Sequence, residues 1–368
     1  MSTLFHTVIR PALAVTITAL MSTASLGANV ALLPSTTLIK PVNFNISDLV
    51  LNVPTTETAF TGQELLDSIG RYKSLPMTYS AVELDKDPVA KSIALLKRLN
   101  VKFNTDRFIP LNDKWFGFQS DEDPSAIFEL DSRTGNVHFN AGLKRYNGEE
   151  STPNLPKGKE ETIQFAAQHL INLELLPPLT EINLQKIELG GLNMAIPDGQ
   201  GRSKVFEKLK TVRAYRVLNG LEVEGDSRIV MNIGEKGALA GVVFKWPKVG
   251  EGQALTENDL IPAVELRELA LSNIQRVIAK TQNPELKEVK LVLYDDGQGI
   301  IEPAYHFIIN RNFNLGTTAR ATELTMIPFD FYLPILNKSR AVFPDMESVR
   351  VIPLGGIDEK QGNVGKDE

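Results

Sequence analysis

The chain has 368 residues, of which 42% are hydrophobic, 23% charged and 7% aromatic, the composition of a folded globular protein and not of a disordered or fibrous one. Acidic residues outnumber basic ones by 45 to 39, a balance that argues against nucleic-acid binding, which needs a concentrated basic surface. The absence of cysteine excludes disulfides, thiolate metal sites and a cysteine nucleophile. A chain of this length is expected to fold as roughly two or three domains.

The first 28 residues have the features of a signal peptide. Arg10 is the only formally charged side chain before Lys40, and the apolar stretch that follows it ends in small residues. This stretch is shorter than the ~20 apolar residues that a membrane span requires. We therefore expect a signal peptide at residues 1–28, a secreted or periplasmic protein, and no membrane span in the mature chain. An uncleaved anchor or a loose apolar N-terminus is the alternative.

Residues 29–80 are rich in Thr, Ser, Asn and Pro and predict an extended arm that lies along the body of the protein, with one short helix at Gly62–Arg71. At the other end of the chain, residues 355–368 have no apolar periodicity and are expected to form a disordered tail.

A pattern of one helix followed by several strands then begins at residue 81. In the first unit, residues 81–147, Asp87-Pro88 supplies a helix N-cap and an N1 proline. Alternating apolar and polar residues predict the strands that follow, at Lys114–Gln119, Ala126–Asp131 and Asn136–Ala141.

The pattern returns twice after a Pro- and Gly-rich linker. The second unit, residues 158–250, has a helix that is stopped by Pro177-Pro178, and then four predicted strands: Ile182–Leu189, Thr211–Leu218, Asp226–Ile233 and Ala238–Trp246. The third unit, residues 255–354, opens with a helix and continues with three predicted strands: Val289–Tyr294, Ala304–Asn310 and Ala321–Leu333. Pro328 places the last of these at a sheet edge.

Three such units predict an α+β protein made of tandem cystatin-like units, each a helix packed on a curled antiparallel sheet. Parallel βαβ units are disfavoured, because the helices do not alternate with the strands and the strand connections are short.

The second unit resembles the PepSY and fungalysin/thermolysin-propeptide (FTP) modules. The resemblance rests on the tyrosine-containing strand at Tyr215, the hairpin Asn219-Gly220, and the glycines at 225 and 237 where the chain turns again. It extends, less specifically, over residues 158–335. It implies a cystatin-like fold in a secreted or envelope protein that inhibits or assists a protease, although no protease domain follows here.

Catalytic and metal-binding motifs are not found. None of the histidines after the leader (His138, His169 and His306) is followed by Glu, so the H-E-x-x-H zinc motif cannot be written. The acidic clusters Asp121–Asp123 and Asp295-Asp296 lack the spacing of a calcium loop and read as solvated turns. We expect no cofactor and no metal.

What remains is a candidate binding surface on the second unit. Along two of its strands, Arg and Tyr alternate with apolar residues, so one sheet face can present the side-chain types that anchor interfaces. The predicted partner-binding residues are Arg213, Tyr215, Arg216 and Arg228. We expect a non-enzymatic protein that binds an exported protein or peptide, with a protease as one option. The alternatives are a hydrolase or isomerase that uses Asp/Glu and Tyr, and a carrier of a small apolar ligand.

Overall fold

The computed structural model describes residues 62–83, 87–99, 101–105, 109–142, 151–197, 203–278, 282–313 and 325–344. The predicted signal peptide, most of the predicted arm and the predicted C-terminal tail lie outside these residues. The described residues form two compact units. Unit 1 comprises residues 72–257 and 292–303, and unit 2 comprises residues 62–71, 258–291 and 304–344.

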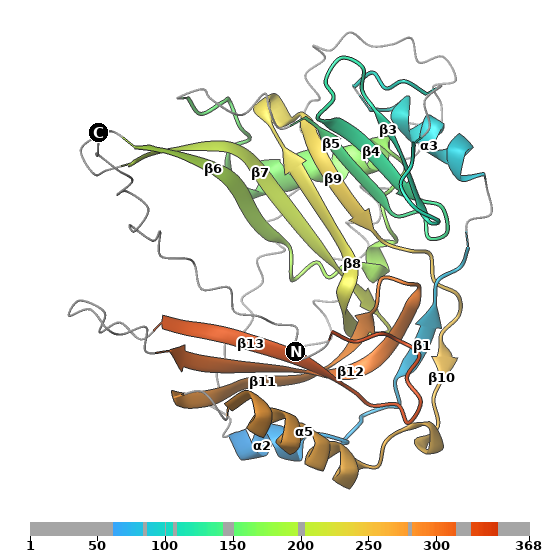
Figure 1. Ribbon diagram of the computed structural model, residues 1–368, viewed down its shortest axis with the longest axis vertical. Coiled ribbons are helices and arrows are strands. Elements are labelled where there is room, and N and C mark those ends of the chain that lie inside the picture. The colour runs from blue at the N-terminus through green and yellow to red at the C-terminus, as the bar shows by residue number, and fades with distance from the viewer. Residues whose placement is uncertain are drawn as a thin grey trace, which may run out of the picture. The chain divides into compact units, whose positions relative to one another are not determined.

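Unit 1 contains a large, mostly antiparallel sheet (Figure 1). Its strands follow the order β6-β7-β8-β9-β5-β4-β3-β2, each antiparallel to its neighbours. The bounds of these strands are β2 Ile109–Pro110, β3 Trp115–Gln119, β4 Ala126–Asp131, β5 Val137–Ala141, β6 Glu188–Pro197, β7 Ser203–Leu218, β8 Leu221–Ile233 and β9 Leu239–Lys245. Two short strands, β1 (Met77–Ser80) and β10 (Gln253–Ala254), pair with each other.

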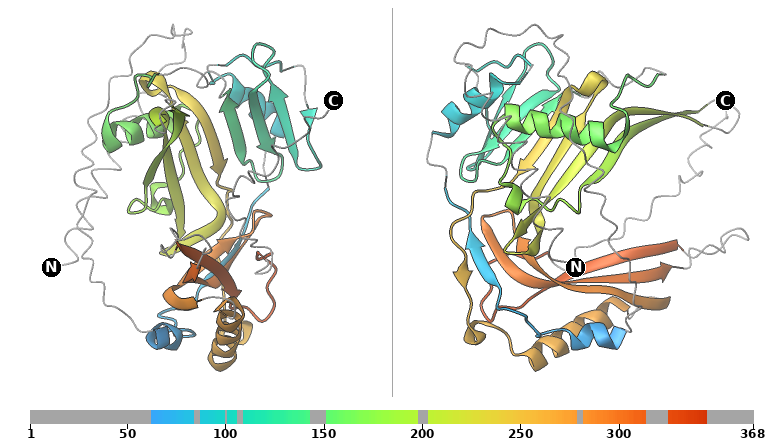
Figure 2. Two further views of the ribbon diagram at one scale, coloured as in Figure 1. Left: turned by 60° about the vertical axis from the view of Figure 1, so that its left-hand side comes forward. Right: turned by 180° about the vertical axis from the view of Figure 1, so that it is seen from behind.

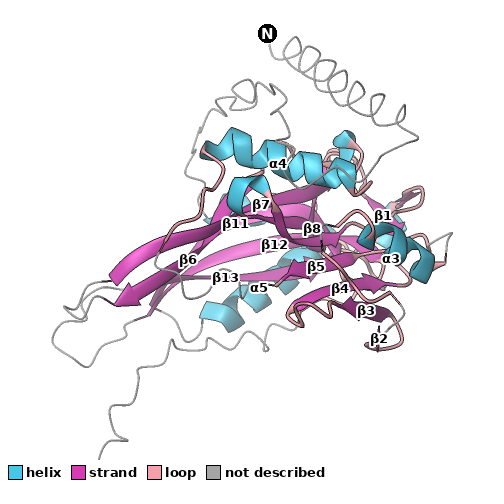
Figure 3. Cartoon of the chain, turned by 90° about the horizontal axis from the view of Figure 1, so that it is seen from above, coloured by secondary structure: helices cyan, strands magenta, loops and turns pink. Residues whose placement is uncertain are grey.

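Helices α3 (Pro88–Leu96) and α4 (Gly158–Asn172) cover one face of this sheet (Figures 2 and 3). Asp87 caps α3 as predicted, because its side chain accepts a hydrogen bond from the Val89 amide at 2.9 Å. The alternating apolar residues of the strands meet the apolar faces of both helices in one core. That core includes Leu96, Phe128, Phe139, Leu170, Met231 and Trp246. The opposite face of β7, β8 and β9 carries no helix of the described part of unit 1 (Figure 2).

The β7–β8 hairpin is the best-predicted local structure. Asn219 and Gly220 have φ angles of 48° and 80°, the positive values that a type I′ turn requires. Beyond the turn, the pairing is interrupted: Arg216 lies opposite Val223, whereas Tyr215 lies opposite Arg228. Strand β8 therefore bends between Val223 and Arg228. At this bend, residues 223–225 pair in parallel with residues 293–295 of β11 (Gln282–Asp295).

Unit 2 packs helices beside an antiparallel strand pair. Helices α2 (Gly62–Asp67) and α5 (Ala263–Ile278) lie side by side (Figure 1), and Arg267 of α5 donates to the Ile69 carbonyl. Strands β12 (Ile300–Phe313) and β13 (Thr325–Pro334) pair from Ala304 onward. Phe307 and Phe331 stack with ring centroids 4.6 Å apart.

The α+β class predicted from the sequence is correct, but separate tandem cystatin-like units are not confirmed. Strand β5 of the first predicted unit pairs with β9 of the second, so the two share one sheet. The first strand of the second unit was also misplaced. We expected it at Ile182–Leu189, whereas β6 begins at Glu188 and runs to Pro197. No helix in the described part of the chain is long and apolar enough to cross a membrane.

Candidate functional site

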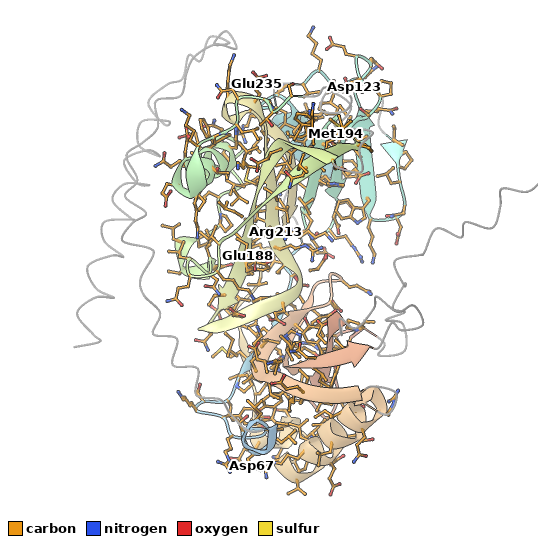
Figure 4. The ribbon with its side chains drawn as sticks, turned by 90° about the vertical axis from the view of Figure 1, so that its left-hand side faces the viewer. Asp67, Asp123, Glu188, Met194, Arg213 and Glu235 are labelled. Carbon is orange, nitrogen blue, oxygen red and sulfur yellow. The ribbon has the colours of Figure 1, made fainter. Side chains whose placement is uncertain are left out.

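Three of the four predicted binding residues lie on the helix-free face of the unit 1 sheet. Tyr215 of β7 lies directly opposite Arg228 of β8, and Arg213 lies opposite Glu188 of β6 (Figure 4). Arg213 and Arg228 are exposed, and Tyr215 is half-buried. The adjacent residues of β7 and β8, whose side chains point to the other face of the sheet, include Val212 and Ile229. They are buried in the core, as the alternation predicted. We call Glu188, Arg213, Tyr215 and Arg228 the Arg-Tyr face.

Tyr215 is held in place at the centre of this face. Its hydroxyl donates a hydrogen bond of 2.7 Å to Glu188 Oε2, and Lys186 Nζ lies 4.8 Å from the centre of its ring. Burial, reinforced by the hydrogen bond to the Glu188 carboxylate, raises the pKa of Tyr215 to about 12. The phenol is therefore neutral at physiological pH and presents a fixed ring with an engaged hydroxyl.

The two arginines near Tyr215 differ from the lysines around it in making no close ion pair with a described residue, although the Glu188 carboxylate lies on the strand opposite Arg213. The nearby lysines are each paired, Lys245 with Asp226 at 2.6 Å and Lys186 with Glu222 at 3.4 Å. Within the described part of the chain, neither Arg213 nor Arg228 makes an ion pair; Arg228 donates only to the Gly225 carbonyl, at 3.2 Å. The Arg-Tyr face therefore offers two exposed guanidinium groups next to a tyrosine ring, one on the same strand and one on the neighbouring strand.

Arg216, the fourth predicted binding residue, does not belong to this face. Its side chain is only 1% exposed and lies on the core side of β7, which it shares with Val212 and Ala214. The strand pattern placed Arg216 on that side, and grouping it with the exposed arginines was wrong. It is an internal ion-pair partner and cannot contact another molecule while the sheet is intact.

Buried Arg216 is surrounded by acceptors. Its Nε and Nη2 donate to Glu181 Oε2 at 3.0 and 2.6 Å, and its Nη1 donates to the Pro247 carbonyl at 2.9 Å. The guanidinium lies 5.3 Å from the Trp246 ring, whose Nε1 also donates to Glu181 Oε2. Desolvation lowers the pKa of Arg216, and Glu181 counteracts that effect. Sequence reasoning missed this cluster because its members are far apart in the chain.

A second polar contact fixes the bend of β8. Ser227 donates a 2.5 Å hydrogen bond to Asp295 Oδ2, and the Gly297 amide donates to Asp295 Oδ1 at 2.9 Å. Asp295 is 2% exposed, and burial raises its pKa above the ordinary aspartate value despite these two hydrogen bonds. The sequence had suggested that Asp295 lies in a solvated turn, and this is wrong, because parallel pairing with β8 covers it.

The Asp295 contacts lead to a stability prediction with a defined sign. The pKa of Asp295 is higher in the folded protein than in the unfolded chain, so at a pH above the unfolded-state pKa the native state binds more protons. The free energy of unfolding should therefore fall as the pH rises from the unfolded-state pKa through the folded-state pKa. Asp295→Asn should remove this pH dependence, because its carbonyl still accepts from the Gly297 amide and its NH2 group can donate to the Ser227 hydroxyl. Asp295→Ala should cost about 1–3 kcal/mol, because it leaves both donors unsatisfied. Urea unfolding of the three proteins from pH 4 to 8 measures both effects.

The histidines take separate structural places. His138 Nδ1 lies 3.0 Å from Glu129 Oε2 on neighbouring strands, His169 Nε2 lies 2.8 Å from the Gly237 carbonyl, and His306 Nε2 lies 3.2 Å from Asp330 Oδ2 in unit 2. Burial lowers the pKa of His169. Among the residues that the structure describes, no cluster of three or more His, Asp or Glu side chains is placed to hold a metal ion.

Comparison with known proteins assigns no family. No protein-family model matches the chain, and no curated protein matches it. Among solved structures, an uncharacterized protein from Eubacterium rectale aligns with a TM-score of 0.42 at 9% identity, over 72% of this chain and 84% of its own. The Bacillus megaterium YpeB C-terminal domain aligns with a TM-score of 0.29 at 8% identity, over 70% of this chain and 95% of its own. These likenesses are too distant to indicate an activity.

Proposed function

We propose that the chain is an exported, non-enzymatic protein-binding module of PepSY/FTP-like design, which holds an acidic segment of another exported protein on the Arg-Tyr face and acts as its inhibitor or chaperone. The observation that carries the proposal is the pair of exposed guanidinium groups of Arg213 and Arg228 beside the anchored Tyr215, neither of which makes an ion pair with a residue that the structure describes. The N-terminal sequence pattern supports export.

The chemistry of the Arg-Tyr face suits a carboxylate-bearing polypeptide. A guanidinium group binds a carboxylate through two parallel N–H···O hydrogen bonds, a geometry that a lysine cannot reproduce. Tyrosine and arginine are enriched at the centres of protein interfaces. The antiparallel strands β7 and β8 hold the three side chains on one surface, and no described helix of unit 1 covers it.

The geometry around Tyr215 favours binding over acid–base chemistry. A tyrosine with a pKa of about 12, whose hydroxyl already donates to Glu188, is poorly suited to accept or donate a catalytic proton near neutral pH. Glu188 is likewise engaged by that hydroxyl. The Arg-Tyr face therefore supports recognition of a partner better than its chemical conversion.

A pull-down from the exported fraction of the source cells tests the proposal. The double variant Arg213→Glu, Arg228→Glu should lower the recovery of the bound protein by about tenfold or more, because like charges then face its acidic segment. The matched control is Lys97→Glu, Arg133→Glu, which makes the same change of net charge at exposed positions outside the Arg-Tyr face. Mass spectrometry of the eluate identifies proteins and small molecules in the same sample.

The outcomes are distinct. Equal recovery by the wild type and both double variants would overturn the role of the Arg-Tyr face. An eluate that contains a stoichiometric small apolar molecule and no protein would replace protein binding by ligand carriage. Circular dichroism of each variant shows whether the fold is retained, and retention is expected because both arginines are exposed.

A further inference from the structure

Strand β6 presents an open edge. It pairs with β7 along its whole length, and its other side pairs with no strand in the described part of the chain (Figure 1). An edge strand exposes a row of backbone N–H and C=O groups that another strand can pair with. Proteins usually protect such edges with charged side chains, above all lysine.

The β6 edge has almost none of this protection. Residues 189–197 (LGGLNMAIP) carry no charged side chain, and the strand is ten residues long. Leu189 and Leu192 are 40% and 39% exposed, and Val205 on the adjoining end of β7 is 63% exposed. Within the described strand, the edge is blunted by Glu188 at its start, by Pro197 at its end and by an irregular register after Leu192. A long, partly apolar edge with a single charged residue is suited to pairing with a strand of the same character.

We propose that β6 is a self-association edge, along which two copies of this chain pair antiparallel about a twofold axis at Leu192. A twofold axis perpendicular to the sheet leaves the same face of both copies on the same side. Paired residues must then point to the same face, so an even-numbered residue of β6 lies opposite an even-numbered one and an odd-numbered residue opposite an odd-numbered one. Centring on Leu192 satisfies that condition and pairs Glu188 with Ile196 of the second copy at both ends.

This register is also complementary in size and charge. It places Gly190 opposite Met194 of the second copy, so a small residue meets a large one. Ile196 pairs with Lys204 on β7, so Lys204 of one copy and Glu188 of the other lie on the same sheet face, two strands or about 10 Å apart at Cα. Lys and Glu side chains can bridge that distance, and the symmetry makes two such contacts. A parallel arrangement would bring like charges together instead.

Twofold pairing also makes the assembly finite. Each copy has one β6 edge, and an isologous interface uses both edges at once, which gives a closed dimer and no filament. The two sheets then become one continuous sheet, and the Arg-Tyr faces of both copies lie on the same side of it. The self-association proposal does not depend on the proposed partner of that face.

Sedimentation velocity of the purified chain over a range of concentrations tests the proposal. We expect a dimer that Leu192→Lys weakens by about tenfold or more, because two ammonium groups would meet at the axis. Val264→Lys is the matched control, since Val264 is a 68% exposed residue of α5 and lies outside β6. Circular dichroism should show both variants folded, because Leu192 is already partly exposed.

Disulfide trapping tests the register itself. The chain contains no cysteine, so a single Leu192→Cys substitution introduces the only thiol, and oxidation should join two copies covalently. Val264→Cys should not form a linked dimer under the same conditions. A monomer at all concentrations, a dimer that Leu192→Lys leaves unchanged, or equal crosslinking of both cysteine variants would overturn the proposal. The outcome is independent of the pull-down, which uses residues of β7 and β8.

Discussion

Glu181→Ala is expected to lower the free energy of unfolding by about 3–5 kcal/mol, the usual cost of removing one partner from a buried ion pair. Glu181 Oε2 accepts hydrogen bonds from Arg216 and from Trp246 Nε1, and Arg216 is 1% exposed. Without the carboxylate, the guanidinium would lose its ion-pair partner in a desolvated environment and would keep the Pro247 carbonyl as a hydrogen-bond acceptor. Equilibrium denaturation in urea, followed by the fluorescence of Trp246 and the second tryptophan, Trp115, measures the loss.

Two controls separate a buried-charge effect from a general one. Glu122→Ala removes an exposed ion pair with Lys102, whose side chains are 66% and 86% exposed, and should cost less than about 1 kcal/mol. The double variant Glu181→Leu, Arg216→Met removes both charges and should recover most of the loss, because no unpaired charge then remains buried. If Glu181→Ala cost no more than Glu122→Ala, water would be solvating Arg216 and the ion pair would not be an internal one.

The ion pair also affects the candidate binding face through the backbone. Arg216 follows Tyr215 directly, at the point where the register of β7 and β8 shifts. The Asn183 amide, close to Glu181 in the chain, donates to the Tyr215 carbonyl at 2.9 Å. The core-side ion pair therefore helps to fix the strand segment that holds Tyr215 on the opposite face.

Local signals in the sequence predicted local structure well. Asp87-Pro88 began a helix, Asn219-Gly220 made the turn of a hairpin, and the alternation at Ile229, Met231 and Ile233 identified the buried face of β8. Each of these signals depends on residues that are close together in the chain. They also placed Arg213, Tyr215 and Arg228 on one face of the sheet, because alternate residues of a strand point to opposite faces.

Long-range pairing was what the sequence could not show. Nothing near Asp295 indicates that a parallel strand covers it, and nothing near Arg216 indicates Glu181 as its partner. Strand β6 was misplaced for a different reason: the segment before Gly190-Gly191 alternates as a strand should, whereas the two glycines disfavour a strand. Pairing with the long strand β7 overrides that weak local preference. The residues that weaken the strand signal, Gly190 and Gly191, also have no side chains to protect the edge of β6.

Gly225→Ala is the second substitution with a large expected effect, a loss of more than about 3 kcal/mol. Gly225 has a φ of 87°, a left-handed conformation that costs an alanine about 1–2 kcal/mol. A Cβ at this position would lie 2.2 Å from the backbone oxygen of Asp295 and 3.0 Å from Tyr294 Cε2. The oxygen belongs to the strand that pairs in parallel with β8, so it can move away only if that pairing opens.

Gly220→Ala isolates the conformational part of this cost. Gly220 has a φ of 80°, close to that of Gly225, but an added Cβ there would have no atom within 4 Å. Its expected loss is therefore only the backbone term of about 1–2 kcal/mol. The difference between the two variants in urea unfolding measures the steric term, and it should exceed about 1 kcal/mol. Equal losses would show that β8 and β11 separate readily at the bend, and Asp295 would then be accessible to water and lose its raised pKa.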